Sequence, residues 1–301
     1  MPASASKVHP VTVVAEHVED PIGRQGPRNS HETEHNAVPQ PRTREPPRHP
    51  PNAPGTVTIM TSRIQRAGAT VRRPANFWTP AIHDLLRYLQ AADFPAPRSL
   101  GTEGETEILT WIDGESGPAG WAKIVPESGL RNWAAFLRRY HEAVADYRPP
   151  PSSTWSSRTG TCAPGEIICH GDFGPWNGVW RGGRPVGLID FDHARPALPI
   201  FDIAYALEYA APFRDDSECL RWLRYPHPPD RRRRIEVFCD AYGIAVPSGI
   251  TGRIAWQQRL TLQNCQTLAS QGIEPQATWV REGYLDTIRA RINWTESLQI
   301  P

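Results

Sequence analysis

The sequence predicts an α+β protein in which a small antiparallel sheet with one helix precedes a larger, mainly helical part. Short strand-like runs, such as residues 69–73, lie in the first half of the chain. Apolar residues at helical spacing follow, first over residues 131–147 and then in several stretches beyond residue 200. With 301 residues, 39% of them hydrophobic, the chain can form one large domain or two lobes that share a core.

The first 54 residues have the composition of a disordered tail. They contain 11 of the 32 prolines and no Phe, Trp or Tyr, so they cannot bury enough apolar surface to offset the entropy of ordering. Within this tail, His31, Glu32 and His35 match the H-E-x-x-H spelling of zinc proteases. That chemistry requires a buried helix, whereas these flanks are polar and Pro39 follows soon after. We therefore interpret the match as accidental.

The small sheet is predicted from residue 55 onward. Residues 56–61 and 69–73 are expected to form two strands joined by a turn near Gly68. Residues 107–112 form another strand-like run, which ends at Asp113-Gly114. We expect residues 55–112 to form a small lobe and residues 113–301 a larger helical lobe.

One helix is expected to dock on this sheet. Thr79 can cap it, Pro80 suits its first position, and the apolar residues that follow recur at helical spacing: Ile82, Leu85, Leu86 and Leu89. Beyond residue 200, helices are expected over residues 201–211, 229–242, 253–270 and 278–293.

Composition and charge exclude several classes of protein. The formal net charge is +1, so no global field would hold the chain on nucleic acid or on an anionic membrane. The basic run Arg231–Arg234 is interpreted as a solvated helix face. No stretch approaches the ~20 apolar residues of a membrane helix, and the five cysteines are scattered without a C-x-x-C pair. These features predict a cytoplasmic protein with reduced thiols and no nucleic-acid or membrane partner.

The segment with the most chemical information contains two acidic loops. An apolar run over residues 167–169 is followed by His170-Gly171-Asp172, and Asn177 comes five residues after Asp172. A second apolar run, residues 186–189, is followed by Asp190. We expect the two runs to be adjacent strands, whose ends bring two carboxylates and an amide together.

These residue types suit phosphoryl transfer, which needs correct positioning and charge neutralisation more than covalent chemistry. A carboxylate such as Asp172 can accept the proton of an attacking hydroxyl. Asn177 and Asp190 offer the oxygen ligands that Mg²⁺ prefers. The order and spacing also match the catalytic loop and metal-binding Asp of protein kinases.

The stretches HGDFGPWN, LIDFDHA and FDIAY resemble the aminoglycoside phosphotransferase and choline kinase group. The resemblance implies a two-lobed protein-kinase-like fold and transfer of the γ-phosphate of ATP, or of another nucleoside triphosphate, to a hydroxyl of a small molecule. It implies that Asp172 is the catalytic base, that His170 supports the catalytic loop, and that Asn177 and Asp190 bind Mg²⁺. Asp202 would brace the loop from the next helix. Asp192 is a further possible metal or substrate contact, ranked below Asp190.

The small lobe departs from the kinase pattern in two ways. Where a strand lysine is expected, the sequence has Arg72 and Arg73, and the following helix has no clear glutamate to pair with it. Alternate strand residues face opposite sides, so only one arginine should reach the nucleotide, and we select Arg73. The segment before Gly68 also contains little glycine for a loop around phosphates.

Two functional alternatives stay open at this level. The leading one is an active small-molecule kinase, and the other is a pseudokinase or nucleotide-binding regulatory module without turnover. The acceptor is equally open among an aminoglycoside, a choline-like alcohol and another hydroxylated metabolite. A polycationic acceptor would need a carboxylate-rich pocket, for which the sequence offers Glu208, Asp215, Asp216 and Glu218.

Overall fold

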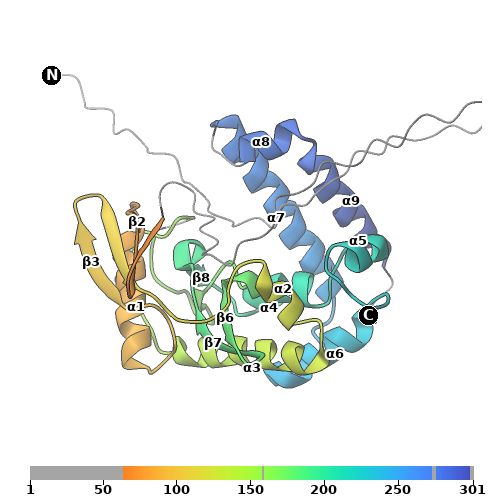
Figure 1. Cartoon of the computed structure of the whole chain (residues 1–301), viewed down its shortest axis with the longest axis horizontal. Helices are drawn as coiled ribbons and strands as arrows, with labels where there is room; N and C mark the ends of the chain where they lie inside the picture. The colour runs from red at the N-terminus through yellow and green to blue at the C-terminus, as the bar shows by residue number, and fades with distance from the viewer. Residues whose placement is uncertain (1–63, 158, 273–275, 299–301) are drawn as a thin grey trace, which may run out of the picture.

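A computed structural model describes residues 64–157, 159–272 and 276–298 of the 301. It has the two-lobed, kinase-like α+β fold that the sequence predicts, with a small antiparallel sheet at one side and a mainly helical part beside it (Figure 1). The predicted tail, its H-E-x-x-H match and the predicted strand over residues 56–61 lie outside the described residues.

The small sheet has four antiparallel strands in the order β1-β2-β4-β3. The strands are β1 (Gln65–Ala67), β2 (Thr70–Pro74), β3 (Ser99–Glu103) and β4 (Thr106–Thr110), and helix α1 (Thr79–Ala91) follows β2. The strand predicted at residues 69–73 is confirmed. Its partner on one side is β1, which the sequence did not indicate.

Helix α1 begins differently from the prediction. Trp78 occupies the N-cap position and makes no side-chain cap. The Thr79 hydroxyl instead accepts a hydrogen bond from the backbone N–H of Asn76, at 2.8 Å. The predicted apolar face is correct, since Ile82, Leu85 and their neighbours at helical spacing are at most 1% exposed.

The larger part contains eight α-helices in the described residues. They are α2 (Ala119–Lys123), α3 (Glu127–Ala143), α4 (Ile200–Ala210), α5 (Asp216–Arg221), α6 (Arg231–Tyr242), α7 (Ile250–Ser270), α8 (Gln276–Arg281) and α9 (Tyr284–Ser297). The single helix predicted over residues 278–293 is wrong. It is divided at Gly283, whose φ of +87° is the left-handed conformation that glycine adopts without strain.

Helix α3 lies at the centre of the core. Its residues Trp133 and Tyr140 are fully buried, and the Trp133 ring stacks on Phe173 with centroids 4.2 Å apart. This aromatic packing holds the segment after β5 against the buried face of α3. The Tyr140 hydroxyl also donates to the carbonyl of Ile168 at 2.9 Å, which ties α3 directly to that strand.

Two short hairpin-like sheets present the acidic loops. Strand β5 (Ile167–Cys169) pairs with β8 (Arg195–Ala197), and β6 (Gly178–Arg181) pairs with β7 (Arg184–Leu188). The expectation that the strands before Asp172 and Asp190 are adjacent is therefore wrong, because β5 and β7 belong to different sheets. The two loops meet instead through close backbone packing at Gly171 and through a side-chain hydrogen bond from His170.

The basic run at the start of α6 is solvated only in part: Arg232 and Arg233 are exposed as predicted, whereas the other two arginines are buried. Arg231 and Arg234 are each 9% exposed. The Arg234 guanidinium donates to the carbonyls of Ile124 (2.6 Å) and Val125 (2.9 Å) after α2, and to Ala210 (2.7 Å) at the end of α4. This side chain therefore joins three helices from inside the protein.

Two further findings concern the chain as a whole. All five cysteines are free thiols, and four of them are buried. Among the helices of the described ranges, none is both long enough and apolar enough to span a bilayer.

Candidate functional site

The loop after β5 is held close to the loop after β7 by a glycine. Gly171 has φ of +81°, and a Cβ atom there would lie 2.1 Å from the carbonyl oxygen of His193. That distance is far shorter than any tolerated contact, so a side chain at this position would separate the loops. The glycine lets the backbone beside Asp172 pass directly over the segment η2 (Phe191–His193).

Asp202 braces the same loop from the first turn of α4. Its carboxylate is fully buried and accepts hydrogen bonds from the backbone N–H groups of His170 (2.6 Å) and Gly171 (2.9 Å) and from His141 Nε2 (3.2 Å). Burial alone would raise the pKa of Asp202, but the bond and charge of His141 and the backbone donor outweigh it and hold the pKa below its usual range. The carboxylate therefore stays ionised.

His170 connects the two acidic loops. Its Nε2 lies 3.0 Å from the carbonyl oxygen of Ile189, and its Nδ1 lies 3.3 Å from the backbone N–H of Asp172. A carbonyl only accepts and an N–H only donates, so the ring carries its proton on Nε2. Burial lowers the pKa of His170, which is consistent with a neutral ring. Its geometry is that of a support, and it places Asp172 and Asp190 at a fixed separation.

Asp172 is held by hydrogen bonds to both carboxylate oxygens. Asn177 Nδ2 donates to Oδ2 at 2.8 Å and to the backbone carbonyl of the same residue at 2.9 Å. The Tyr205 hydroxyl donates to Oδ1 at 2.5 Å. Burial and the Asp172 charge raise the pKa of Tyr205 well above its usual value, so the phenol remains a donor. The structure thus brings together the three residues of the predicted catalytic loop, and adds Tyr205.

Asp190 occupies an unusual backbone conformation. Its φ of 64° and ψ of 69° place it in the left-handed region, which Asp tolerates better than most other non-glycine residues. Strain of this kind persists where the surroundings dictate it, and it is common at functional sites. The turn directs the chain so that Asp190 and Asp192 both lie next to an arginine from the small sheet.

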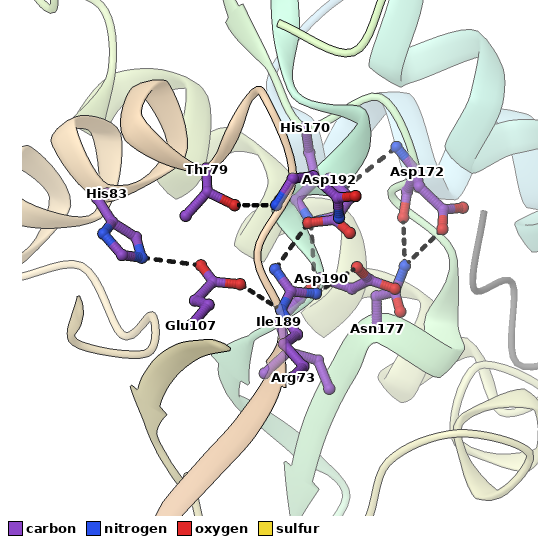
Figure 2. A network of polar contacts seen from close by, with 11 residues as sticks. Arg73, Thr79, His83, Glu107, His170, Asp172, Asn177, Ile189, Asp190 and Asp192 are labelled. Atoms are coloured by element: carbon purple, nitrogen blue, oxygen red, sulfur yellow. Dashed lines mark hydrogen bonds and ion pairs between the residues drawn. The ribbon is translucent and has the colours of Figure 1, made fainter. Parts of the chain in front are cut away.

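That arginine is Arg73. Figure 2 shows its guanidinium between Glu107 on one side and Asp190 and Asp192 on the other. Nε lies 2.6 Å from Glu107, and the terminal nitrogens lie 2.7 Å from Asp192 and 3.5 Å from Asp190. Burial opposes the charge, but the three carboxylates raise the pKa of Arg73 above its usual value, so it stays protonated. Arg72 pairs with the exposed Glu103 instead.

Sequence reasoning missed Glu107 as the partner of Arg73. Glu107 is 1% exposed, lies directly across from Arg73 in the β2–β4 register, and also bonds to His83 Nε2 at 2.9 Å. Burial tends to raise the pKa of Glu107, but the bonds from His83 and Arg73 lower it overall. The acidic partner of Arg73 thus comes from the neighbouring strand, and helix α1 supplies a histidine to that glutamate.

The donor atoms beside Arg73 suit a hard divalent cation. Asn177 uses its amide nitrogen on Asp172, which leaves its oxygen as the remaining donor atom. Asp190 and Asp192 contribute carboxylates with side-chain exposures of 22% and 15%. A small set of oxygen ligands with access for water is what Mg²⁺ requires.

Comparison with known proteins agrees with this geometry. Residues 161–237, which contain both acidic loops and α4, match the model of the phosphotransferase enzyme family. Over 189 residues the chain is 34% identical to the trifolitoxin immunity protein of Rhizobium leguminosarum bv. trifolii, a match that covers 60% of this chain and 70% of that protein.

Solved structures show the same fold at low identity. An amicoumacin kinase, determined in complex with AMP-PNP, Ca²⁺ and its ligand, superposes with a TM-score of 0.53 at 12% identity, over 77% of this chain and 83% of that one. A choline/ethanolamine kinase family protein from Mesorhizobium loti gives a TM-score of 0.53 at 15% identity, over 78% and 85% of the two chains. The match to the immunity protein, at 34% identity over 70% of its length, and the match of residues 161–237 to the family model show that the chain belongs to the phosphotransferase enzyme family.

Proposed function

We propose that the protein transfers the γ-phosphate of ATP, or of another nucleoside triphosphate, to a hydroxyl group of a small molecule in the presence of Mg²⁺. The observation that carries this proposal is the position of Asp172. Its carboxylate is ionisable, oriented by Asn177 and Tyr205, and connected through His170 to the loop that holds Asp190. A module that only binds nucleotide has no use for a proton acceptor oriented in this way.

In this reaction Asp172 accepts one proton. As the acceptor oxygen forms its bond to the γ-phosphorus, the bond from that phosphorus to the bridging oxygen breaks, and the electron pair leaves with the nucleoside diphosphate. The proton of the acceptor hydroxyl passes to a carboxylate oxygen of Asp172. The hydrogen bonds from Tyr205 and Asn177 hold this carboxylate in a single orientation, which lowers the entropic cost of reaching the transition state.

The metal ligands proposed for this site are Asn177 and Asp190, with Asp192 as an additional carboxylate. Bound there, Mg²⁺ would neutralise charge on the phosphate oxygens. The fit rests on two partly exposed carboxylates beside Arg73 and on the amide oxygen of Asn177, whose backbone carbonyl accepts from the N–H of Ile189, the residue before Asp190, at 2.9 Å.

Arg73 is the proposed phosphate-binding cation. Its Nε donates to Glu107 on strand β4, and this hydrogen bond fixes the orientation of the guanidinium. The two terminal nitrogens now face Asp190 and Asp192. Those nitrogens can release the carboxylates and bind phosphate oxygens instead, because a guanidinium binds carboxylate and phosphate alike through two parallel hydrogen bonds.

A nucleotide-binding regulatory module is the second candidate. One observation favours it: in the structure Arg73 spans the carboxylates that would bind the metal. In this alternative the ion pairs are permanent and the site never turns over. The two candidates differ in whether Mg²⁺ displaces Arg73 from Asp190 and phosphate oxygens displace the carboxylates from Arg73.

Substitutions at the two aspartates test the proposal directly. Asp190→Ala should abolish Mg²⁺-dependent nucleotide binding, whereas Asp172→Ala should retain binding and lose turnover, because one residue binds metal and the other accepts a proton. Asp286→Ala is a matched control, since this aspartate lies on α9 with a side chain that is 83% exposed. Calorimetric titration with ATP and an ADP-release assay measure the two properties. Nucleotide binding that is equal with and without Mg²⁺ in the wild-type protein would contradict the metal assignment.

The remaining features of the proposal follow from the same reaction. The acceptor is a small hydroxylated molecule, and the name of the 34% identical relative adds toxins to the compounds worth testing. We also propose that residues 55–112 form the nucleotide lobe, that residues 113–301 carry the acceptor, and that the protein works in the cytoplasm, where ATP is available.

A further inference from the structure

We propose that the acceptor binds on a wall of four aromatic rings beside Asp172, and that this wall selects an acceptor with a planar, conjugated face next to its hydroxyl over a polycationic one. The aromatic wall consists of Trp121, Trp176, Tyr205 and Tyr209. This inference rests on the proposed phosphotransferase function and names the substrate class of that same site.

The four rings form one continuous surface. The Trp176 ring lies 4.7 Å from Tyr209 and 5.1 Å from Trp121, measured between centroids, and Tyr209 lies 5.1 Å from Tyr205. Each of the four residues is only partly buried. This differs from the fully buried Trp133 and Trp180 of the core. The rings meet edge-to-face or at a tilt, with interplanar angles of 86° for Trp176 and Tyr209, 35° for Trp121 and Trp176, and 57° for Tyr205 and Tyr209. The part of each ring that stays exposed offers apolar surface to a flat ligand.

One end of the aromatic wall is the proposed proton acceptor. The Tyr205 hydroxyl donates to Asp172, and Tyr209 follows one helical turn later on the same face of α4. Trp176 lies in the short helix η1 (Pro175–Asn177), between Asp172 and the proposed metal ligand Asn177 in sequence. A molecule stacked on these rings therefore has its edge close to the carboxylate that takes the hydroxyl proton.

Helix α2 is fixed against the catalytic loop, which sets the position of Trp121. The backbone N–H of Gly117 donates to the carbonyl of Trp176 at 2.8 Å. A Cβ atom on Gly120 would lie 1.9 Å from the carbonyl oxygen of Pro175, so only glycine permits this approach. Such close backbone packing gives the wall a defined shape before any ligand arrives.

The cation beside the aromatic wall is paired with a carboxylate. The Arg214 guanidinium lies 5.5 Å from the Trp121 ring and 5.6 Å from the Tyr209 ring, and the residue is 6% exposed. Within the described chain its Nε is buried and has no hydrogen-bond partner. Because Glu218 accepts a hydrogen bond from this guanidinium at 3.0 Å, the pair adds no net charge beside the rings and leaves no free carboxylate there for a polycationic acceptor.

The carboxylates that a polycation would need are already engaged. Glu218 pairs with Arg214 and Arg291, Asp216 pairs with Arg231, and Asp215 caps α5 through the backbone N–H of Ser217. The fourth, Glu208, is 5% exposed, and burial raises its pKa to about 7. The carboxylate-rich pocket considered from the sequence is therefore not available for an aminoglycoside.

Two probes of different chemistry distinguish the possibilities. Naphthylethanol presents a flat conjugated face and one hydroxyl without charge, and kanamycin presents several ammonium groups on non-planar rings. We expect calorimetric binding of naphthylethanol and ADP release that depends on it, with kanamycin at least tenfold weaker in both assays. Trp176→Leu and Tyr209→Leu should each raise the Kd and KM for naphthylethanol by about tenfold, which is the upper range for loss of one aromatic contact.

The controls separate an acceptor effect from a structural one. Both variants should leave the nucleotide KM unchanged, and Trp256→Leu, a 49% exposed tryptophan on α7, should change neither acceptor parameter. The inference is overturned if kanamycin binds more tightly than naphthylethanol, if naphthylethanol does not bind, or if the wall variants behave like Trp256→Leu. Failure of the proposed function looks different: naphthylethanol binds and the variants weaken it, but no acceptor releases ADP.

Discussion

Replacement of Arg73 by alanine is the most informative single change in the nucleotide lobe. It would leave Glu107, Asp190 and Asp192 without the cation that now lies between them. The Arg73 side chain is 14% exposed and Glu107 only 2%, so solvent cannot replace the lost partner effectively. Three neighbouring carboxylates would repel one another, and at least one of them is buried.

The size of the effect can be estimated from these contacts. Removal of one partner from a buried ion pair costs about 3–5 kcal/mol. For a domain of this size each kcal/mol corresponds to about 2–4 °C in Tm, so Arg73→Ala should lower the Tm by about 6–20 °C. Mg²⁺ should recover part of that loss, because a divalent cation at Asp190 and Asp192 removes the same repulsion.

Arg72→Ala provides the matched control one residue away. Arg72 and Glu103 form a pair whose side chains are 36% and 66% exposed, and exposed pairs contribute about 0–1 kcal/mol. Thermal unfolding followed by circular dichroism, with and without Mg²⁺, gives the stabilities, and steady-state kinetics gives the nucleotide KM. Arg73→Lys should show an intermediate result, since one ammonium group cannot span Glu107 and Asp192 together. Equal, small effects from the two alanine variants would refute the role assigned to Arg73.

Three further predictions follow from buried carboxylates. Glu107→Gln should lower the free energy of unfolding in urea by about 1.5–3 kcal/mol, because a charge-assisted hydrogen bond is lost. It should also raise the KM for nucleotide but not for acceptor, and an equal rise in both KM values would contradict this prediction. Glu208 has a folded pKa of about 7 against 4.5 unfolded, so stability should fall by about 3 kcal/mol as pH rises from 4.5 through 7. Glu208→Gln should remove that decline in unfolding measured at pH 5 and 8, and a slope that persists would exclude this carboxyl as its source. The pKa of Asp202 is lowered in the folded protein, so the stability it contributes is present above its unfolded pKa and is lost as pH falls through its folded pKa. Asp202→Asn should therefore reduce the loss of stability at acid pH and lower kcat. An unchanged loss of stability at acid pH would refute this role of Asp202.

Sequence reasoning succeeded for site residues that lie close together along the chain. The interval from Asp172 to Asn177 is confined to one loop, so the residue types and their order suffice to predict that they meet. The alternation along β2 likewise predicts that Arg72 and Arg73 face opposite ways, because the side-chain period of a strand is two. Their roles in binding nucleotide and metal remain predictions that the proposed variants test.

The features that sequence reasoning missed depend on register or on buried surfaces. Glu107 lies 34 positions from Arg73 and meets it only through the β2–β4 pairing. Tyr205 has helical spacing with core residues, so nothing in the sequence separates a ring that binds a carboxylate from one that only packs. The two buried arginines of α6 were misinterpreted for a related reason: a basic run on a helix is usually solvated, and only the tertiary structure reveals carbonyls beside it.

Arg234 has a consequence for the order in which the protein becomes functional during synthesis. The helix with Trp121 and the helix with Tyr209 contact each other through these rings and are joined further by this guanidinium, which bonds to the carbonyls of Ile124 and Ala210. Residue 234 leaves the ribosome well after both helices. A nascent chain that already exposes Asp172 and the proposed metal ligands should therefore lack a finished aromatic wall until α6 has emerged and docked.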